Sequence, residues 1–186
     1  MALRSIPAHV RYPGIIPAVT TPFGADGELD IGSLEANVRE MVAFYGQVAD
    51  DGGLPIMAYN NPAASGVDLA AETLAQIARE VPGLVAVKEC SGDTRRIPAL
   101  LAATDLEVLV GGDDWALEGF AGGATGWVSG VANVAPRECA ALWERLQDGD
   151  LAHAREIYAR ILPLGRLDMT PKLVQFFKAA DRKSVV

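Results

Sequence analysis

Five short apolar runs alternate along this chain with segments of helical periodicity, and that alternation most constrains the fold. The runs read GIIPAVT, LPIMAY, LVAVK, EVLV and GWVSGV, and predict strands at 14–20, 54–59, 84–88, 107–110 and 126–131. Strands this apolar are typical of parallel sheets, in which both faces are buried. The pattern therefore predicts an α/β fold whose parallel sheet is covered by helices.

The segments between and after these runs have helical spacing. An apolar stripe from Leu34 to Ala49 predicts the first helix. Further helices are predicted at 69–80, 95–103, from 115, 136–147, 151–162 and 171–180. Because the chain is wholly helical after the last predicted strand, we expect a sheet-containing domain over residues 1–149 and a helical extension over 150–186.

Charge and composition exclude several classes of partner. The 186 residues carry a net charge of −8, which disfavours nucleic acid and anionic membrane surfaces, since both attract basic faces. No span of roughly 18 apolar residues suggests a membrane helix. Cys90 and Cys139 lie far apart without metal-ligand spacing. We expect a cytoplasmic protein with no metal site and no cofactor.

Polar and glycine-rich residues gather just after the predicted strands. They include Thr20–Thr21, Tyr59–Asn61, Lys88–Glu89, Gly112–Asp114 and Ser129–Asn133. Parallel α/β folds place their functional sites at this edge of the sheet. The sequence therefore predicts one site assembled from several strand ends.

Lys88 ends the run Leu84–Val87 and is the candidate nucleophile of that site. A buried ammonium must be paired, lose its proton or take part in chemistry. One interpretation is a salt-bridged or snorkelling lysine at a strand end. The other is a desolvated amine that forms a Schiff base with a carbonyl substrate. The polar residues at the other strand ends favour the second interpretation.

The strand-end motifs, taken in order, resemble the dihydrodipicolinate synthase / N-acetylneuraminate lyase family of class I aldolases. The matching stretches are GIIPAVTTPFGADGELD (14–30), LPIMAYNNPAASGVDL (54–69), LVAVKECSGD (84–93), VLVGGDD (108–114), GWVSGVANVAPR (126–137) and PKLVQFFKAA (171–180). Together they cover most of the chain, so the resemblance is more specific than any single motif.

The resemblance implies a TIM (β/α)8 barrel with additional C-terminal helices, assembled into a homo-oligomer. It implies a pyruvate-like 2-oxo acid substrate, bound as an imine. Lys88 matches the Schiff-base lysine, and Tyr59 matches the tyrosine that relays protons to it. Gly112 and Val128 match positions that lie against the bound keto acid.

One departure from the family pattern concerns the residue that binds a second substrate, the one that reacts with the bound keto acid. An arginine often follows the YNNP-type turn and binds a carboxylate, but this chain has Ala64 at that position. The change disfavours dihydrodipicolinate synthase proper. It leaves open a deaminase or dehydratase that acts on a hydroxyproline-derived pyrroline carboxylate or on a sugar acid.

The second departure is the absence of a stretch of sequence that the family has after its first strand-helix unit. The family's Gly-Thr-Thr-Gly-Glu type loop, which holds the keto acid's carboxylate, has no counterpart here. About three strand-helix units are absent from an eight-stranded plan. The stripe from Leu34 to Ala49 continues across the join, which favours an internal deletion. We therefore expect an open sheet of about five strands, and a third alternative is a catalytically incompetent fragment.

Overall fold

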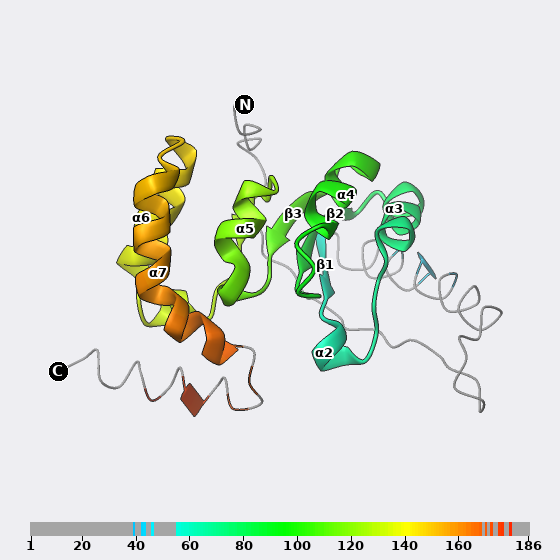
Figure 1. Cartoon of the computed structure of the whole chain (residues 1–186). Coiled ribbons are helices and arrows are strands. Elements are labelled where there is room, and N and C mark those ends of the chain that lie inside the picture. Colours follow the sequence, from blue (N-terminus) through cyan, green and yellow to red (C-terminus); the bar gives the residue numbers. More distant parts are fainter. Residues whose placement is uncertain are drawn as a thin grey trace.

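The computed structural model describes residues 55–168 continuously and also residues 39, 42, 43, 46, 170, 172, 175, 176 and 179. Its centre is a parallel sheet with the strand order β1-β2-β3-β4 (Figure 1). The strands are β1 (Ile56–Asn60), β2 (Leu84–Glu89), β3 (Glu107–Val110) and β4 (Gly126–Trp127). The predicted α/β class with a parallel sheet is confirmed, and the strand predicted at 14–20 lies outside the described residues.

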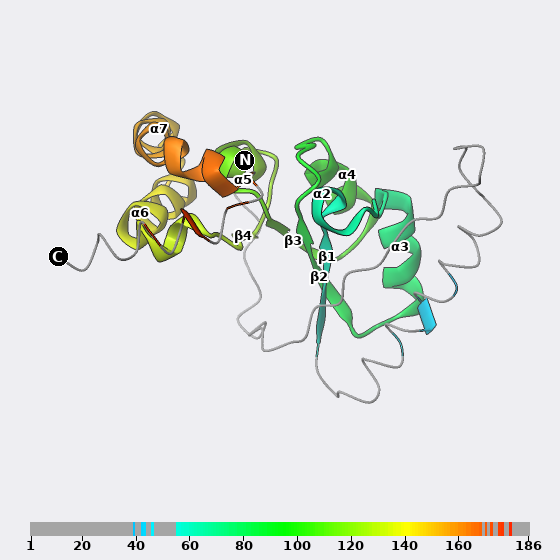
Figure 2. The ribbon, with the colours of Figure 1, turned by 90° about the horizontal axis from the view of Figure 1, so that it is seen from below.

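Helices follow each strand and cover the sheet. They are α2 (Pro62–Ser65), α3 (Ala71–Glu80), α4 (Arg96–Ala103), α5 (Ala116–Ala121), α6 (Pro136–Gln147) and α7 (Leu151–Asp168), with 3-10 turns η1 (Asp113–Trp115) and η2 (Val131–Asn133). In both ribbon views α3 and α4 lie beside β1 and β2, whereas α6 and α7 form a pair beyond α5 (Figures 1 and 2). The helical extension was predicted to begin at residue 150. The first helix of that stretch is α7, and it packs against α6 and η1.

The core is built from the apolar faces that the periodicity predicts. Leu74 and Ile77 of α3, Ile97 and Leu100 of α4 and Val108 of β3 are fully buried. Val42, in the predicted first helix, is helical and packs against this core. Burial of such side chains is the main stabilising contribution to a fold of this kind.

Several predicted boundaries are wrong, and among them the strand predicted at 54–59 runs from Ile56 to Asn60. The strand predicted over 126–131 ends at Trp127, because the Val131 N–H donates to Oδ2 of Asp113 (2.8 Å) instead of to a neighbouring strand. The helix predicted from 69 starts at Ala71, because the backbone of Ala70 is extended (φ −56°, ψ 155°) and cannot be part of the helix. The last long helix continues past Leu162 to Asp168 although Pro163 lies inside it.

Two further predictions fall partly or wholly outside the described residues. Most of the first helix, over 34–49, and most of the helix over 171–180 belong to that part of the chain, although Gln175, Phe176 and Ala179 are helical. The predicted join lies inside this first helix, between Val42 and Phe44, where the structure describes Val42 and Ala43 as helical. Among the described residues, no helix is long and apolar enough to cross a membrane.

Candidate active site

The carboxyl ends of β1 and β2 bring the two predicted catalytic residues together. Tyr59 and Lys88 are register partners on these parallel strands, so their side chains leave the sheet on the same face. The Lys88 Nζ lies 4.0 Å from the centroid of the Tyr59 ring. At this distance the ring face attracts a cation.

Both side chains line one cavity of about 620 Å³. Its described lining comes from four strand ends and from the end of α7. The lining residues are Tyr59, Asn61, Ala63, Ala64, Lys88, Cys90, Gly111, Val128, Ser129, Gly130, Asp168 and Thr170. An amine and a phenol that face one cavity can supply a nucleophile and a proton donor.

The two predicted binding residues are placed differently. Val128 lines the cavity and is 37% exposed. Gly112 is not among the described lining residues; a Cβ there would lie 2.2 Å from Nε1 of Trp115. Its neighbour Gly111 lines the cavity instead, and a Cβ there would lie 2.7 Å from both Cβ of Cys90 and the Glu89 carbonyl oxygen. Glycine at both positions lets the β3 end approach its neighbours closely.

Asn61 fixes the environment of the Tyr59 hydroxyl. The Asn61 side chain caps α2, where its Oδ1 accepts from the Ala64 N–H (3.2 Å). Its Nδ2 then donates to Oη of Tyr59 (2.6 Å). Because the cap determines which end of the amide faces the phenol, Oη accepts from Asn61 and keeps its own hydrogen for another partner.

Asp168 brings an anion into the cavity from the end of α7. Its Oδ2 accepts from the Asp113 N–H at 3.4 Å. Burial raises the pKa of the Asp168 carboxyl, whereas that hydrogen bond and the charge of Lys88 lower it. Sequence reasoning missed Asp168 because the helix that carries it was predicted to end at Leu162.

Two other titratable groups near the site have raised pKa values. Burial raises the pKa of the Cys90 thiol, and the charge of Lys88 acts in the opposite direction. Burial also raises the pKa of Asp113 to about 6, although hydrogen bonds from Ser129, Val131 and Gly130 lower it. Asp113, predicted to lie in a loop or cap a helix, braces the β4–η2 loop through Val131. No group of three or more potential metal ligands occurs among the described residues.

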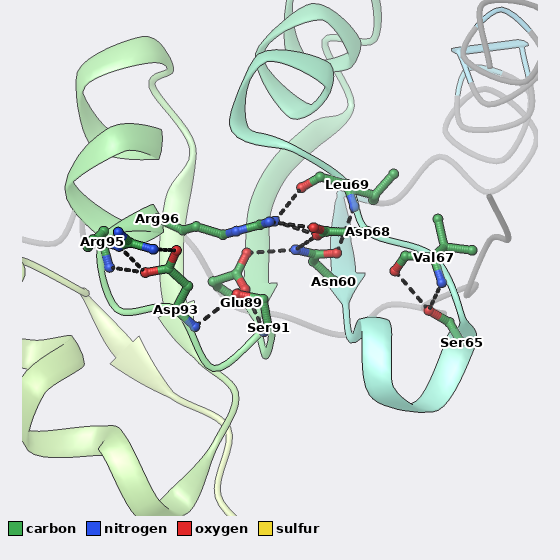
Figure 3. A network of polar contacts seen from close by, with 10 residues as sticks. All are labelled: Asn60, Ser65, Val67, Asp68, Leu69, Glu89, Ser91, Asp93, Arg95 and Arg96. Atoms are coloured by element: carbon green, nitrogen blue, oxygen red, sulfur yellow. Dashed lines mark hydrogen bonds and ion pairs between the residues drawn. The ribbon is translucent and has the colours of Figure 1, made fainter. Parts of the chain in front are cut away.

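A polar network lies behind the two catalytic candidates, one residue further along each strand (Figure 3). Asn60 and Glu89 are register partners and are both buried. The Asn60 Nδ2 donates to Oε2 of Glu89 at 2.8 Å. Figure 3 also shows Arg96 reaching from α4 to Asp68, with which it forms an ion pair.

Comparison with known proteins shows which family this chain resembles. The dihydrodipicolinate synthetase family model matches residues 34–182. The 4-hydroxy-tetrahydrodipicolinate synthase of Methanothrix thermoacetophila is 39% identical over 133 residues, 70% of this chain and 45% of that protein. The enzyme of the same name from Kineococcus radiotolerans is 45% identical over 123 residues, 66% of this chain and 40% of that protein.

Solved structures show the same relationship. Dihydrodipicolinate synthase from Aquifex aeolicus superposes with a TM-score of 0.70 at 29% identity, over 76% of this chain and 50% of that one. YagE of E. coli K12 gives a TM-score of 0.72 at 24% identity, over 78% of this chain and 51% of that one, and shares the fold. This chain therefore spans about half the length of these relatives or somewhat less. Since the family model covers most of the sequence, the chain belongs to the dihydrodipicolinate synthetase family.

Proposed function

We propose that this protein is a lyase that binds pyruvate or a similar 2-oxo acid as a Schiff base on Lys88, in an aldol-type reaction. The observation that carries the proposal is that Lys88 and Tyr59 line one cavity together, with 4.0 Å between Nζ and the ring centroid. Two family structures, those of E. coli YagE and the Acinetobacter baumannii enzyme, were solved in complex with pyruvate.

In the proposed reaction the free amine of Lys88 attacks the carbonyl carbon and forms a carbinolamine. The Tyr59 hydroxyl gives a proton to the carbinolamine oxygen, which leaves as water, and the imine remains. The protonated imine then draws the electron pair of a bond on the adjacent carbon, so that this bond breaks and an enamine forms. When a C–H bond breaks, its proton goes to the Tyr59 phenolate. When a C–C bond breaks, the phenolate takes the hydroxyl proton of the departing fragment, which leaves as a carbonyl compound. In the synthetic direction the enamine carbon attacks an acceptor carbonyl, and hydrolysis of the new imine regenerates the amine.

Borohydride trapping with pyruvate, read by intact mass, tests this proposal. Reduction converts the imine into a stable secondary amine, so we expect one pyruvate adduct per chain on the wild-type protein. Lys88→Arg keeps the charge but cannot form the imine, and we expect no adduct. An adduct that persists in Lys88→Arg would remove the site assignment. Absence of an adduct on the folded wild type would support the third alternative, an incompetent fragment.

A second candidate function is supported by the part of the cavity lining that α2 supplies. Ala63 and Ala64 line it, and Lys88 is the single cation among its described lining residues. A second substrate with its own carboxylate therefore finds no described arginine there, which favours a deaminase or dehydratase over the aldol step. Turnover of a hydroxyproline-derived pyrroline carboxylate or of a sugar acid, without turnover of an aldol acceptor, would select this function.

We also propose that the active form is a cytoplasmic homo-oligomer. An open parallel sheet leaves edges that another chain can cover. Size-exclusion chromatography with light scattering tests this, and a monomeric, active protein would contradict it.

A further inference from the structure

The hydrogen-bonded pair Asn60–Glu89 lies on the opposite side of the sheet from the cavity. Successive side chains on a strand point to opposite faces, and Tyr59 and Lys88 directly precede Asn60 and Glu89 on β1 and β2. Asn60 is 1% exposed and Glu89 is fully buried. The pair thus joins the same two strand ends that carry the catalytic candidates, on the face of the sheet opposite to the cavity.

Every polar contact of this pair has a defined direction. The Leu69 N–H donates to Oδ1 of Asn60 (2.9 Å), so the amide nitrogen must face the glutamate. That nitrogen donates to Oε2 of Glu89 at 2.8 Å. The Ser91 N–H donates to Oε1 of Glu89 at 2.6 Å. Both carboxylate oxygens therefore accept, and the pair fits together in only one arrangement of donors and acceptors.

Further polar contacts connect the Asn60–Glu89 pair to Asp68, Arg96 and the backbone of Leu69. Asn60 Nδ2 also approaches Oδ1 of Asp68 at 3.4 Å. Asp68 forms an ion pair with Arg96, whose Nη1 donates to the Leu69 carbonyl oxygen at 3.2 Å. Figure 3 shows these residues as one continuous chain of contacts from the start of α4 to the end of β1. A buried anion is costly unless it is hydrogen-bonded and compensated, so this enclosure has a clear electrostatic role.

The Asn60–Glu89 hydrogen bond can form only in one register of β1 against β2. A slip of one residue between parallel strands would turn Tyr59 or Lys88 to the opposite face. Such a slip would also separate Asn60 from Glu89 and leave buried polar groups without partners, which is strongly unfavourable. The Cys90 N–H donates to the Asn60 carbonyl oxygen (2.8 Å), and the Gly111 N–H donates to the Glu89 carbonyl oxygen (2.7 Å), so the backbone of the pair also continues the sheet.

We propose that Asn60 and Glu89 are positioning residues that lock the register of the β1 and β2 ends and thereby hold Tyr59 against Lys88. They act through the backbone and touch neither substrate nor the reacting atoms. The inference rests on the proposed function only where imine formation is the readout, since the placement of Lys88 over the Tyr59 ring can be measured without any substrate.

The decisive variants change which member of the pair donates the hydrogen bond and which accepts it. Glu89→Gln keeps an oxygen for the Ser91 N–H but turns an amide nitrogen toward the amide nitrogen of Asn60, so two donors meet. The double variant Asn60→Asp/Glu89→Gln restores one donor and one acceptor between the two side chains and keeps the net charge. In the double variant the carboxylate at position 60 faces Oδ1 of Asp68, which lies 3.4 Å from Asn60 Nδ2 in the wild type. Two acceptors repel each other there, so we expect most of the effect to be recovered rather than all of it.

The first readout is NMR of lysine labelled with 13C at Cε, with the Lys88 signal assigned from Lys88→Arg. The Tyr59 ring should shift the Lys88 methylene protons upfield in the wild type. We expect Glu89→Gln to move this signal toward the value of an exposed lysine, and the double variant to return it. A Lys88 signal unchanged in folded Glu89→Gln would overturn the inference.

The second readout is the rate of borohydride-trapped pyruvate adduct at saturating pyruvate. Displacement of a catalytic group by about 1 Å can slow a reaction on the order of 100-fold, so we expect at least about a tenfold decrease in Glu89→Gln and recovery in the double variant. Leu142→Ala, a buried change in α6, serves as the control for lost stability. It should lower the melting temperature without changing the trapping rate of the folded protein.

These readouts separate failure of the inference from failure of the proposed function. A wild type without an adduct contradicts the function, while the NMR shift still decides the positioning role. If Glu89→Gln does not fold, the double variant decides. Recovery of the fold and of the shifted Lys88 signal supports the inference, and failure to recover either one overturns it.

Discussion

The Nζ of Lys88 lies 4.0 Å from the centroid of the Tyr59 ring, and the two residues are register partners on parallel strands. Their mutual placement therefore depends on the backbone of the sheet and not on a flexible loop. Sites built on strands keep their geometry better than sites built on loops. This relationship makes the roles of the tyrosine ring and of its hydroxyl separable by experiment.

Tyr59→Phe keeps the ring under Lys88 and removes only the hydroxyl. General acid–base groups contribute about 100-fold or more to rate, so we expect trapping of the pyruvate adduct to slow by about that factor. The ring-current shift of Lys88 should remain. Tyr158→Phe is the matched control, because the buried Tyr158 hydroxyl lies 3.5 Å from the Asp113 carbonyl oxygen and outside the described cavity lining. Equal trapping rates for Tyr59→Phe and wild type would contradict the proton-relay role.

Asn61→Asp reverses the polarity next to the Tyr59 hydroxyl. A carboxylate can still cap α2 through the Ala64 N–H, but it accepts the phenolic hydrogen instead of donating to Oη. We expect a melting temperature close to that of wild type and a trapping rate lower by about tenfold. Asn61→Ala, which removes the cap as well, should lose stability in addition. A normal trapping rate in Asn61→Asp would show that the direction of this hydrogen bond is unimportant.

Asp113→Asn should change how stability depends on pH. Burial raises the pKa of Asp113 from 3.8 to about 6 in the folded protein. A raised carboxyl pKa stabilises the fold below the unfolded value, and this contribution is lost as pH rises through about 6. The asparagine variant cannot ionise, so its stability relative to wild type should increase by about 1 to 3 kcal/mol between pH 4 and pH 7.

Denaturant unfolding at pH 4, 5, 6 and 7 measures this difference. The amide oxygen of the variant can still accept from the Val131 N–H, so the hydrogen bond to η2 is conserved. Asp168 also has a raised pKa and remains in the variant, so part of the dependence on pH should persist. A stability difference that is constant over this range would contradict the assignment.

Gly165→Ala should destabilise the protein although the position is helical. Alanine in place of a helical glycine usually stabilises by about 1 kcal/mol. At position 165 of α7, however, a Cβ would lie 2.9 Å from the Asp113 carbonyl oxygen, and such overpacking typically costs about 1 to 3 kcal/mol. We expect a lower melting temperature and a displaced Asp168.

Gly46→Ala is the control for this prediction. Gly46 is also helical, and a Cβ there meets none of the described residues within 4 Å. We expect this variant to be as stable as wild type or more stable by up to about 1 kcal/mol. Stabilisation by Gly165→Ala would show that α7 does not pack closely on the β3–η1 turn.

Local patterns predicted much of the fold because burial and periodicity leave their mark on sequence. Lys88 and Tyr59 were identifiable since each follows an apolar run, and parallel strands collect their carboxyl ends at one edge. The strand predicted at 126–131 was longer than β4 because its residues are apolar enough for a strand. The competing hydrogen bond from Val131 to Asp113 joins the two 3-10 turns η2 and η1, which lie far apart in sequence, and no local pattern signals it.

The missed site residues share the same explanation. Asp168 enters the cavity from a helix that continues through Pro163, a residue that normally ends or bends a helix. Gly111, not Gly112, is among the described lining residues of the cavity, whereas Gly112 lies against the Trp115 side chain. Glu89 carries a charge that sequence reasoning would place near solvent, whereas the structure buries it fully.

The sequence by itself determined the α/β class, the order of the described strands, the family and the address of the candidate nucleophile, because these follow from local apolar periodicity and from motifs contiguous along the chain. Only the tertiary structure decided the register that places Lys88 over the Tyr59 ring, that Asn60 meets Glu89 behind them and that Asp168 shares their cavity. Register and the packing of distant helices result from many weak contacts between segments far apart in sequence, and a one-residue slip would reverse every face.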